Sequence, residues 1–263
     1  MKRLILFAVG VVLALPVAAQ ADTAFASRLR RSVGERLVYD GRLGPFTLGD
    51  AEIFVAGIDT VRGRETLHVR FRLTTSSFVF KLNDILESWL TLDDLVSLRF
   101  VADHEEAGSR RYNRYEIFPD SGIFHQYRDS AATIPDTIEP TVATPLDDAA
   151  FFFFVRGLPL EVGQRHELHR YFKPDRNPVI LEVLRRESIE VPAGRFNTIV
   201  VRPIIRGNGI FRERADGEIW LTDDPLRRVV QIRSRFPFGN VTLRLVRIER
   251  TQDAAPATTG EVH

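Results

Sequence analysis

The sequence contains no cysteine, and this single absence excludes several classes of protein. Disulfides cannot form, thiol catalysis is impossible, and a lipoprotein anchor cannot be built, because its acyl chains are carried by a cysteine. The fold must therefore be stabilised by burial of apolar side chains alone. A chain of 263 residues is long enough for one substantial core or two smaller ones.

Lysine is also scarce, since Lys2, Lys81 and Lys173 are the only lysines among 36 basic residues. A high arginine content is compatible with phosphate recognition, because the guanidinium fork pairs with phosphate oxygens. A GC-rich genome is the simpler explanation. Acidic residues are interspersed among the arginines, and without Lys2 and Arg3 the balance is 34 basic to 35 acidic residues. No basic stripe results, so no nucleic-acid partner is predicted.

The sequence lacks an apolar run long enough for a membrane-spanning helix. Leu4 to Leu15 follows two basic residues and precedes the small-x-small pattern Ala19-Gln20-Ala21, which predicts a signal peptide over residues 1–21. The run is shorter than the roughly 20 residues that cross a bilayer, and an uncleaved anchor is the alternative. We therefore expect an exported, soluble periplasmic protein that is not a lipoprotein and has no transmembrane segment after cleavage.

Recognisable catalytic motifs are missing as well. The sequence has no Gly-x-Ser-x-Gly elbow, no phosphate loop and no dinucleotide-binding fingerprint. His166 and His169 are three residues apart in a segment that resembles a strand, where such positions point to opposite faces. No catalytic residue, cofactor or metal site is predicted, and enzymatic activity is left open but not expected.

The dominant pattern that is present is an alternation of apolar and polar residues with a period of two. Leu67–Leu73 and Val230–Phe236 show it clearly, and further strands are predicted, among them Gly209–Arg214. Glycine, proline, asparagine and aspartate separate these segments, which favours short turns and an antiparallel meander. Thr75–Glu87 is interpreted differently, as a short helical or irregular turn at a sheet corner. The predicted fold class is all-β and mainly antiparallel.

Two stretches of the chain carry similar motifs in the same order. Val61-Arg62-Gly63-Arg64 recurs as Pro192-Ala193-Gly194-Arg195, and Glu87–Asp93 recurs as Glu218–Asp224, both 131 residues further along. The pattern predicts a duplicated meander of about ten strands that forms one barrel or one curved half-barrel, because strand twist accumulates across large sheets. The predicted domain spans residues 22–252, with halves at about 33–119 and 162–250 and a disordered tail at 253–263.

The repeated positions have a structural interpretation and a functional one. The predicted structural set is Gly63, Trp89, Asp93, Gly194, Trp220 and Asp224. Asp93-Asp94 and Asp223-Asp224 resemble carboxylate dyads, but aspartate directly after a strand is ordinary turn chemistry. The tryptophans are interpreted as core anchors of the two halves, with stacking on a ligand as the alternative.

The segment between the halves, residues 133–158, is predicted to be a crossover followed by a helix over Pro145–Leu158. Asp147 and Asp148 are placed to cap the helix N-terminus. Phe151, Phe152, Phe153 and Phe154 then occupy its whole circumference, which is typical of a helix buried on several sides. Three interpretations remain open: a helix held between half-sheets, a lid or lining for an apolar ligand cavity, and an exposed membrane or partner contact.

Several of these motifs together resemble one known family. Glu187–Phe196, Ile219–Asp224 and Asp148–Arg156, together with the opening Gly34–Tyr39, are similar to an exported bacterial family catalogued as domain of unknown function 3108. The resemblance extends from about Gly34 to Arg250. It implies an exported, β-rich protein of unknown activity and supplies no catalytic residues.

The functional hypotheses follow from export, a curved sheet and an apolar helix. The first is a protein that binds an apolar or amphipathic envelope ligand, such as a lipid, with contacts at Phe151–Phe154. The second is a non-catalytic assembly or interaction scaffold with an envelope protein as partner. The third, a hydrolase of an envelope polymer, has no nucleophile or metal cluster in its favour.

Overall fold

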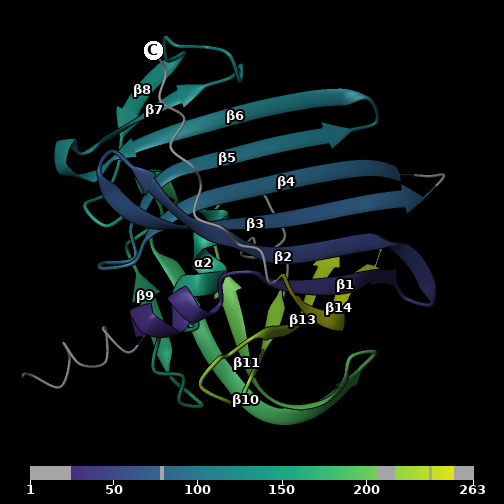
Figure 1. Cartoon of the computed structure of the whole chain (residues 1–263). Coiled ribbons are helices and arrows are strands. Elements are labelled where there is room, and N and C mark those ends of the chain that lie inside the picture. Colours follow the sequence, from purple (N-terminus) through teal and green to yellow (C-terminus); the bar gives the residue numbers. More distant parts are fainter. Residues whose placement is uncertain (1–24, 78–79, 206–216, 237–238, 252–263) are drawn as a thin grey trace, which may run out of the picture.

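The computed structural model describes residues 25–77, 80–205, 217–236 and 239–251 (Figure 1). The predicted signal peptide over residues 1–21, the predicted tail over 253–263 and the strand expected at Gly209–Arg214 lie outside the described residues.

Within these residues, the strands form one antiparallel sheet of fourteen strands in the order β8-β7-β6-β5-β4-β3-β2-β1-β14-β13-β12-β11-β10-β9. Their bounds are β1 Glu35–Leu43, β2 Phe46–Val61, β3 Arg64–Ser77, β4 Phe80–Thr91, β5 Ser97–Glu106, β6 Ser109–Phe118, β7 Ile123–Tyr127, β8 Thr137–Pro140, β9 Arg165–Leu168, β10 Val179–Val191, β11 Gly194–Ile204, β12 Glu218–Thr222, β13 Val229–Phe236 and β14 Gly239–Arg250.

The sheet corrects the predicted strand number, and of the two predicted forms it agrees with the open one and not with the closed barrel. It has fourteen strands, not about ten, and it is an open, curved sheet whose edges are β8 and β9. Part of the difference is β8, which lies in the segment interpreted as an extended crossover and pairs with β7 through Gln126 and Thr137. Because β8 has only four residues, its local pattern is too short to reveal it. The other edge strand, β9, lies in the segment around His166 that was expected to be a strand.

The sheet curls around helix α2, so that β1–β6 form one wall and β10–β14 the other (Figure 1). The walls meet where β1 pairs with β14, and Leu37 lies opposite Ile248. The first and last strands of the meander are therefore neighbours at the centre of the sheet. The accumulated right-handed twist of so many strands produces the curvature.

The turn expected over Thr75–Glu87 was wrong. The end of β3 and most of β4 occupy this segment, and their pairing runs from Thr66↔Thr91 to Ser77↔Phe80. Asn83 and Asp84 lower the local strand propensity. Hydrogen bonding of β4 to both β3 and β5 overrides that preference, because it satisfies the backbone on both sides.

The alternating side chains of the strands separate an apolar inner face from a charged outer face. Leu67, Val69 and Phe71 of β3 are buried and face the helix, while the residues between them point the other way. The outer face carries cross-strand ion pairs, namely Arg70–Glu87, Arg99–Glu116, Arg185–Glu218 and Arg244–Asp40. Much of the arginine content therefore covers the outside of the sheet.

Helix α2 spans Asp148–Val155, which is shorter than the predicted Pro145–Leu158. Residues 25–31 form a second helical segment that was not predicted. The described residues also include two single-turn 3-10 helices, η1 Pro119–Ser121 and η2 Pro174–Arg176. Among the residues that the structure describes, no helix has the length and apolar character needed to cross a bilayer.

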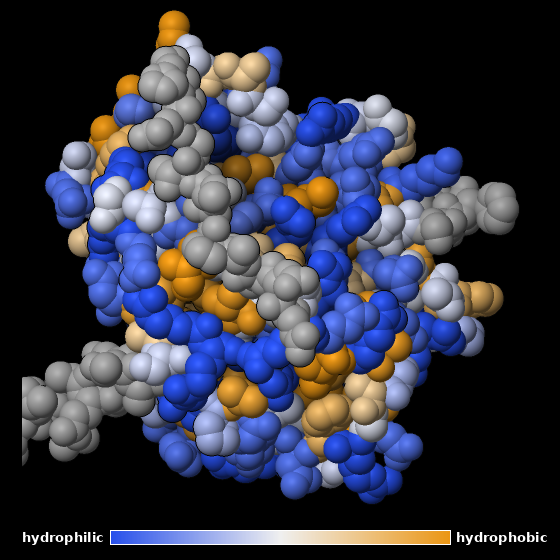
Figure 2. Space-filling view, in the orientation of Figure 1, coloured by the Kyte–Doolittle hydropathy of each residue, from blue (hydrophilic) through white to orange (hydrophobic). Residues whose placement is uncertain are grey.

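Figure 2 shows the molecular face that corresponds to the view of Figure 1, with hydrophilic residues over most of it and apolar patches between them. This surface agrees with a sheet whose apolar side chains are turned toward the helix and whose charged side chains are turned outward.

Candidate functional site

The N-terminal end of α2 is attached to the sheet through a buried carboxyl group. Asp147 Oδ1 accepts hydrogen bonds from the backbone N–H groups of Ala149 and Ala150, both at 2.9 Å. Its Oδ2 accepts from Ser88 Oγ of β4 at 2.6 Å, and its own N–H donates to Ser97 Oγ of β5 at 3.1 Å. This one residue therefore caps the helix and joins it to two strands.

Burial raises the pKa of Asp147 to about 7, although the hydrogen bonds from Ala150, Ser88 and Ser97 oppose the shift. The carboxyl group therefore titrates near neutral pH, far above an ordinary aspartate. When it is protonated, Oδ2 can donate to Ser88 Oγ, and Oδ1 still caps the helix. The attachment of α2 is thus compatible with both protonation states.

The four phenylalanines of α2 lie inside the curved sheet. Phe151, Phe152, Phe153 and Phe154 are only 6%, 7%, 2% and 9% exposed. The ring of Phe152 stacks on Phe71 of β3 with centroids 5.9 Å apart. The helix therefore fills the concave side of β3 and β4. Contact of Phe151–Phe154 with a ligand, or movement of these residues as a lid, remains a prediction.

A polar cluster that the sequence analysis missed lies beside Asp148, at the N-terminal end of α2. The Tyr171 hydroxyl donates to Asp148 Oδ2 at 3.1 Å and accepts from Arg176 Nη1 at 3.2 Å. Lys173 Nζ lies 3.4 Å from the Tyr115 hydroxyl and 4.8 Å from the centre of that ring. Burial lowers the pKa of Lys173. The rarity of lysine in this chain was the one available signal.

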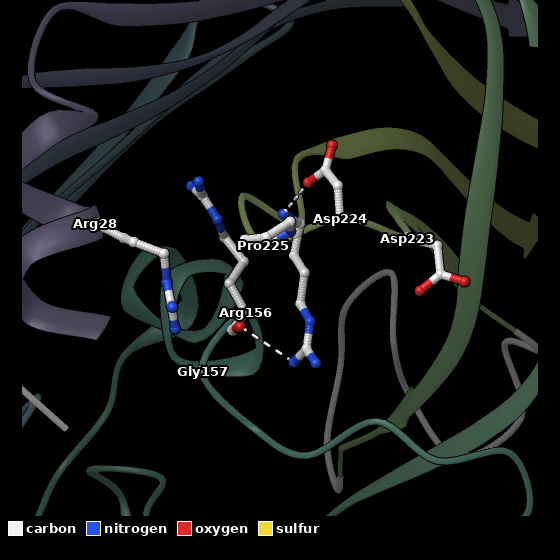
Figure 3. Close-up of a pocket in the computed structure, with 7 residues that line it drawn as sticks. Arg28, Arg156, Gly157, Asp223, Asp224 and Pro225 are labelled. Atoms are coloured by element: carbon white, nitrogen blue, oxygen red, sulfur yellow. Dashed lines mark hydrogen bonds between the residues drawn. The ribbon is translucent and has the colours of Figure 1, made fainter. Parts of the chain in front are cut away.

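A cavity of about 330 Å³ lies at the opposite, C-terminal end of α2 (Figure 3). It is formed by the end of α2, the helical segment 25–31 and the loop between β12 and β13. The lining residues are Arg28, Arg156, Gly157, Asp223, Asp224, Pro225 and Arg227. A Cβ atom on Gly157 would lie 2.7 Å from the ring of Phe25, so glycine is required for segment 25–31 to pack here.

Arg156 is the most deeply buried charged residue of this cavity, with a side chain only 7% exposed. Its Nε donates to the Leu226 carbonyl at 2.9 Å, and its Nη2 lies 3.8 Å from Glu35 Oε1. Glu35 also accepts from Arg228 Nε at 2.6 Å, so two guanidinium groups share one carboxylate. Burial lowers the pKa of Arg156.

The two predicted aspartate pairs lie in separate turns. Arg64 Nη2 contacts Asp93 Oδ1 and Asp94 Oδ1, at 2.9 and 2.8 Å, after β4. After β12, Asp224 Oδ1 accepts from the N–H groups of Leu226 and Arg227 at 2.8 and 3.0 Å, the geometry of an Asx turn. Each aspartate pair therefore bonds to its own turn or to a residue of a nearby strand, and the two pairs do not bond to each other.

The other repeated positions also have defined partners. Trp89 Nε1 donates to Asp59 Oδ2 at 2.9 Å, and the ring stacks on His68 with centroids 4.3 Å apart. Trp220 is buried, and its Nε1 donates to Glu187 Oε1 at 2.7 Å. Each indole therefore bonds a carboxylate of a nearby strand, β2 for Trp89 and β10 for Trp220.

The two glycines of the predicted structural set lie at hairpin turns. Gly63 lies at the β2–β3 turn and Gly194 at the β10–β11 turn. Their φ angles are +79° and +127°, a region that favours glycine because it has no Cβ atom.

The two histidines do not form a shared site. His166 Nε2 lies 2.9 Å from the Pro159 carbonyl oxygen, and His169 Nε2 lies 3.4 Å from Glu167 Oε1. No group of three metal-binding side chains occurs in the part of the chain that the structure describes.

The family model described as "Protein of unknown function (DUF3108)" matches residues 38–246. The chain belongs to DUF3108. The resemblance of Glu187–Phe196 and Ile219–Asp224 is thereby confirmed. DUF3108 brings no assigned activity to this chain, and no curated protein matches it in sequence.

Solved structures of low sequence identity resemble this DUF3108 member to different degrees. A β-barrel-like protein of domain of unknown function DUF1849 from Brucella abortus is 9% identical, with a TM-score of 0.51, and the match covers 83% of this chain and 98% of that one. A candidate lipoprotein from Parabacteroides distasonis is 11% identical, with a TM-score of 0.34 over 82% and 95% of the two chains. A candidate exported protein with a YmcC-like fold from Bacteroides fragilis is 10% identical, with a TM-score of 0.33 over 83% and 96%.

Proposed function

We propose that this protein is an exported, non-catalytic binding protein that holds an apolar or amphipathic molecule of the cell envelope in the space that α2 occupies. The observation that carries the proposal is the helix itself. Phe151–Phe154 make it apolar around its circumference, and it fills the concave side of an open sheet. The surface behind it, which includes Val69 and Phe71, is equally suited to an acyl chain.

The short length of α2 supports its exchange with a ligand. A helix of eight residues is not stable alone in water, so its position depends on its contacts with the sheet. An apolar chain that replaces it would provide β3 and β4 with similar apolar contacts, which keeps the net loss of burial small. The hydrogen bonds of Asp147 to Ser88 and Ser97 and the bond from Tyr171 to Asp148 are among the specific interactions that such an exchange must break.

The setting that we propose is the periplasm, on the basis of the signal peptide expected over residues 1–21. We also infer that the two walls derive from a duplicated meander. Two hairpins support this inference, because β2–β3 turns at Gly63 and β10–β11 turns at Gly194, positions with the same spacing to the Trp89 and Trp220 strands.

A reversible cross-link between α2 and the sheet tests the proposal. The chain has no cysteine, so the double variant Ser88→Cys/Asp147→Cys places a single thiol pair where the two side chains touch at 2.6 Å. We expect the reduced protein to bind a fluorescent fatty acid and the oxidised protein to lose most of that binding. Ser88→Cys alone is the control and should respond to neither oxidant nor reductant.

Equal uptake of the probe by the oxidised and reduced double variant would contradict the exchange of α2. Native mass spectrometry and organic extraction of the wild-type protein, purified from the periplasm, should also reveal a co-purifying lipid. Protein that is free of lipid and takes up no probe in either redox state would refute the proposed function itself.

One observation favours the scaffold hypothesis as a second candidate. The edge strand β8 ends the sheet, and its Ile138 is 57% exposed. Unpaired edges can add a strand from a partner protein. If the lipid experiments fail, a photo-crosslinking residue at Ile138 should label an envelope protein in living cells, and Ile138→Lys at this edge should weaken the interaction.

A further inference from the structure

The cavity at the C-terminal end of α2 has properties that the binding of an apolar molecule does not require. Three arginines line its wall, Arg28, Arg156 and Arg227, and they come from three distant parts of the chain. Its volume of about 330 Å³ lies at the lower end of the range of roughly 300–1,000 Å³ for small-molecule sites.

The two carboxylates of the cavity already bond to other groups. Asp223 Oδ2 accepts from Arg186 Nε at 3.1 Å, outside the lining set. Asp224 Oδ1 accepts from Thr222 Oγ1 at 2.9 Å and from two N–H groups of its own turn. Among the described residues, no ion pair within 4 Å joins either carboxylate to the three lining arginines. The positive charge of the cavity is therefore not neutralised directly by its own acids.

One of the three arginines, Arg28, has a buried donor without an acceptor. Arg28 Nε is buried and has no hydrogen-bond partner in the described part of the chain. Figure 3 shows the Arg28 guanidinium beside the Arg156–Gly157 turn, well away from Asp223. Arg227 Nη1 donates to the carbonyl oxygens of Arg156, at 3.2 Å, and Leu158, which fixes its position at the helix end.

Like charges are close to one another in this cavity. The pKa of Arg227 is lowered first by burial and then by the positive charge of Arg28. A bound anion would relieve that repulsion and would supply oxygen acceptors to the unpaired donor of Arg28. Guanidinium groups pair with carboxylate and phosphate oxygens in a planar, two-bonded geometry, which a halide cannot match.

We propose that this cavity is a binding site for an oxyanion, a phosphate or carboxylate group of a small molecule, held between Arg28 and Arg227 with Arg156 behind them. The inference is independent of the proposed function, because it involves the other end of α2 and does not require the helix to move. It adds a defined polar recognition site to a protein for which the family supplies none.

Isothermal titration calorimetry at low ionic strength tests the site, with inorganic phosphate and citrate as separate probes. We expect saturable binding of one probe by the wild-type protein. Arg28→Gln and Arg227→Gln should each weaken it by about tenfold or more, the loss expected when one charge-assisted bond is removed. Arg31→Gln is the matched control, since it removes the same charge from an exposed position of the same helical segment.

The choice of probe distinguishes the two sources of the oxyanion. Phosphate binding alone supports a phosphoryl ligand, and citrate binding alone supports a carboxylate ligand. No saturable binding of either probe, or equal weakening by Arg28→Gln and Arg31→Gln, overturns the proposal. If Arg28→Gln has lost its far-ultraviolet dichroism, Arg28→Lys replaces it, because lysine keeps the charge but lacks the fork and should still weaken binding.

Discussion

Replacing Asp147 by asparagine removes one buried charge and leaves the shape of the α2 attachment intact. In the Asp147→Asn variant, the side-chain carbonyl can accept from the N–H groups of Ala149 and Ala150, and the side-chain amide can donate to Ser88 Oγ. The variant therefore keeps the helix cap and the bond to β4 that the wild-type carboxyl group makes. What it loses is the ability to ionise.

The expected magnitude follows from the pKa of Asp147, which burial raises from 3.8 to about 7. Because the pKa of Asp147 is higher in the folded state, its contribution to the free energy of unfolding is most favourable below about pH 4. That contribution declines as the pH rises from about 4 to 7 and stays constant above about pH 7. The whole difference corresponds to about 4 kcal/mol at 1.36 kcal/mol per pH unit, of which about 3 kcal/mol falls between pH 5 and pH 8. The stability of the variant relative to the wild type should therefore rise by up to about 3 kcal/mol over that interval.

Urea unfolding followed by tryptophan fluorescence at pH 5 and pH 8 measures this change. Other groups also titrate in this range, so the difference between the two proteins at each pH is the relevant quantity. Both proteins should unfold with the same dependence on urea concentration if the denatured states are equivalent. A stability difference that is the same at pH 5 and pH 8 would refute the reasoning, since Asp147 would then ionise as an exposed aspartate does.

Three further substitutions test the packing around α2. Phe153→Ala should reduce the free energy of unfolding by about 3–5 kcal/mol, because the ring is buried, and a loss below about 1 kcal/mol would contradict its position. Gly157→Ala should reduce the free energy of unfolding by about 1–3 kcal/mol and lower the melting temperature, because its Cβ atom would meet the Phe25 ring. Gly57→Ala is the control and should leave the melting temperature unchanged, because no atom lies within 4 Å of the position of its Cβ atom. Glu35→Gln should cost about 3–5 kcal/mol in urea unfolding, because it leaves the buried Arg156 guanidinium facing that of Arg228 without a shared carboxylate, and an unchanged midpoint would argue against that cluster.

The sequence was informative where the determinants are local. Asp147 before Ala149 and Ala150 is a capping arrangement that a short window reveals, and the run Phe151–Phe154 required burial on several sides. The alternation in Leu67–Leu73 identified a half-buried strand for the same reason. In each case, the physical requirement involves residues within about one helical turn or a few strand positions.

The parts that the sequence did not reveal depend on distant residues. Arg28, Arg156 and Arg227 form one cavity wall only after the sheet has curled, and no spacing rule connects them. Lys173 meets Tyr115 across the gap between two segments in the same way. The short edge strand β8 forms because the neighbouring strand β7 satisfies its backbone groups, which is a tertiary effect.

Because β1 pairs with β14, the order in which the chain is synthesised determines when the sheet can be completed. Glu35 lies opposite Arg250, so the centre of the sheet cannot be completed until the last strand has been made and delivered. Contacts between such distant segments form slowly, because a long loop must close before they are gained. If the chain is threaded through a secretion channel from its N-terminus, as its proposed export requires, β1 can pair with β2 on the far side while its other edge still waits for β14. The native topology would then favour folding after translocation over folding before it.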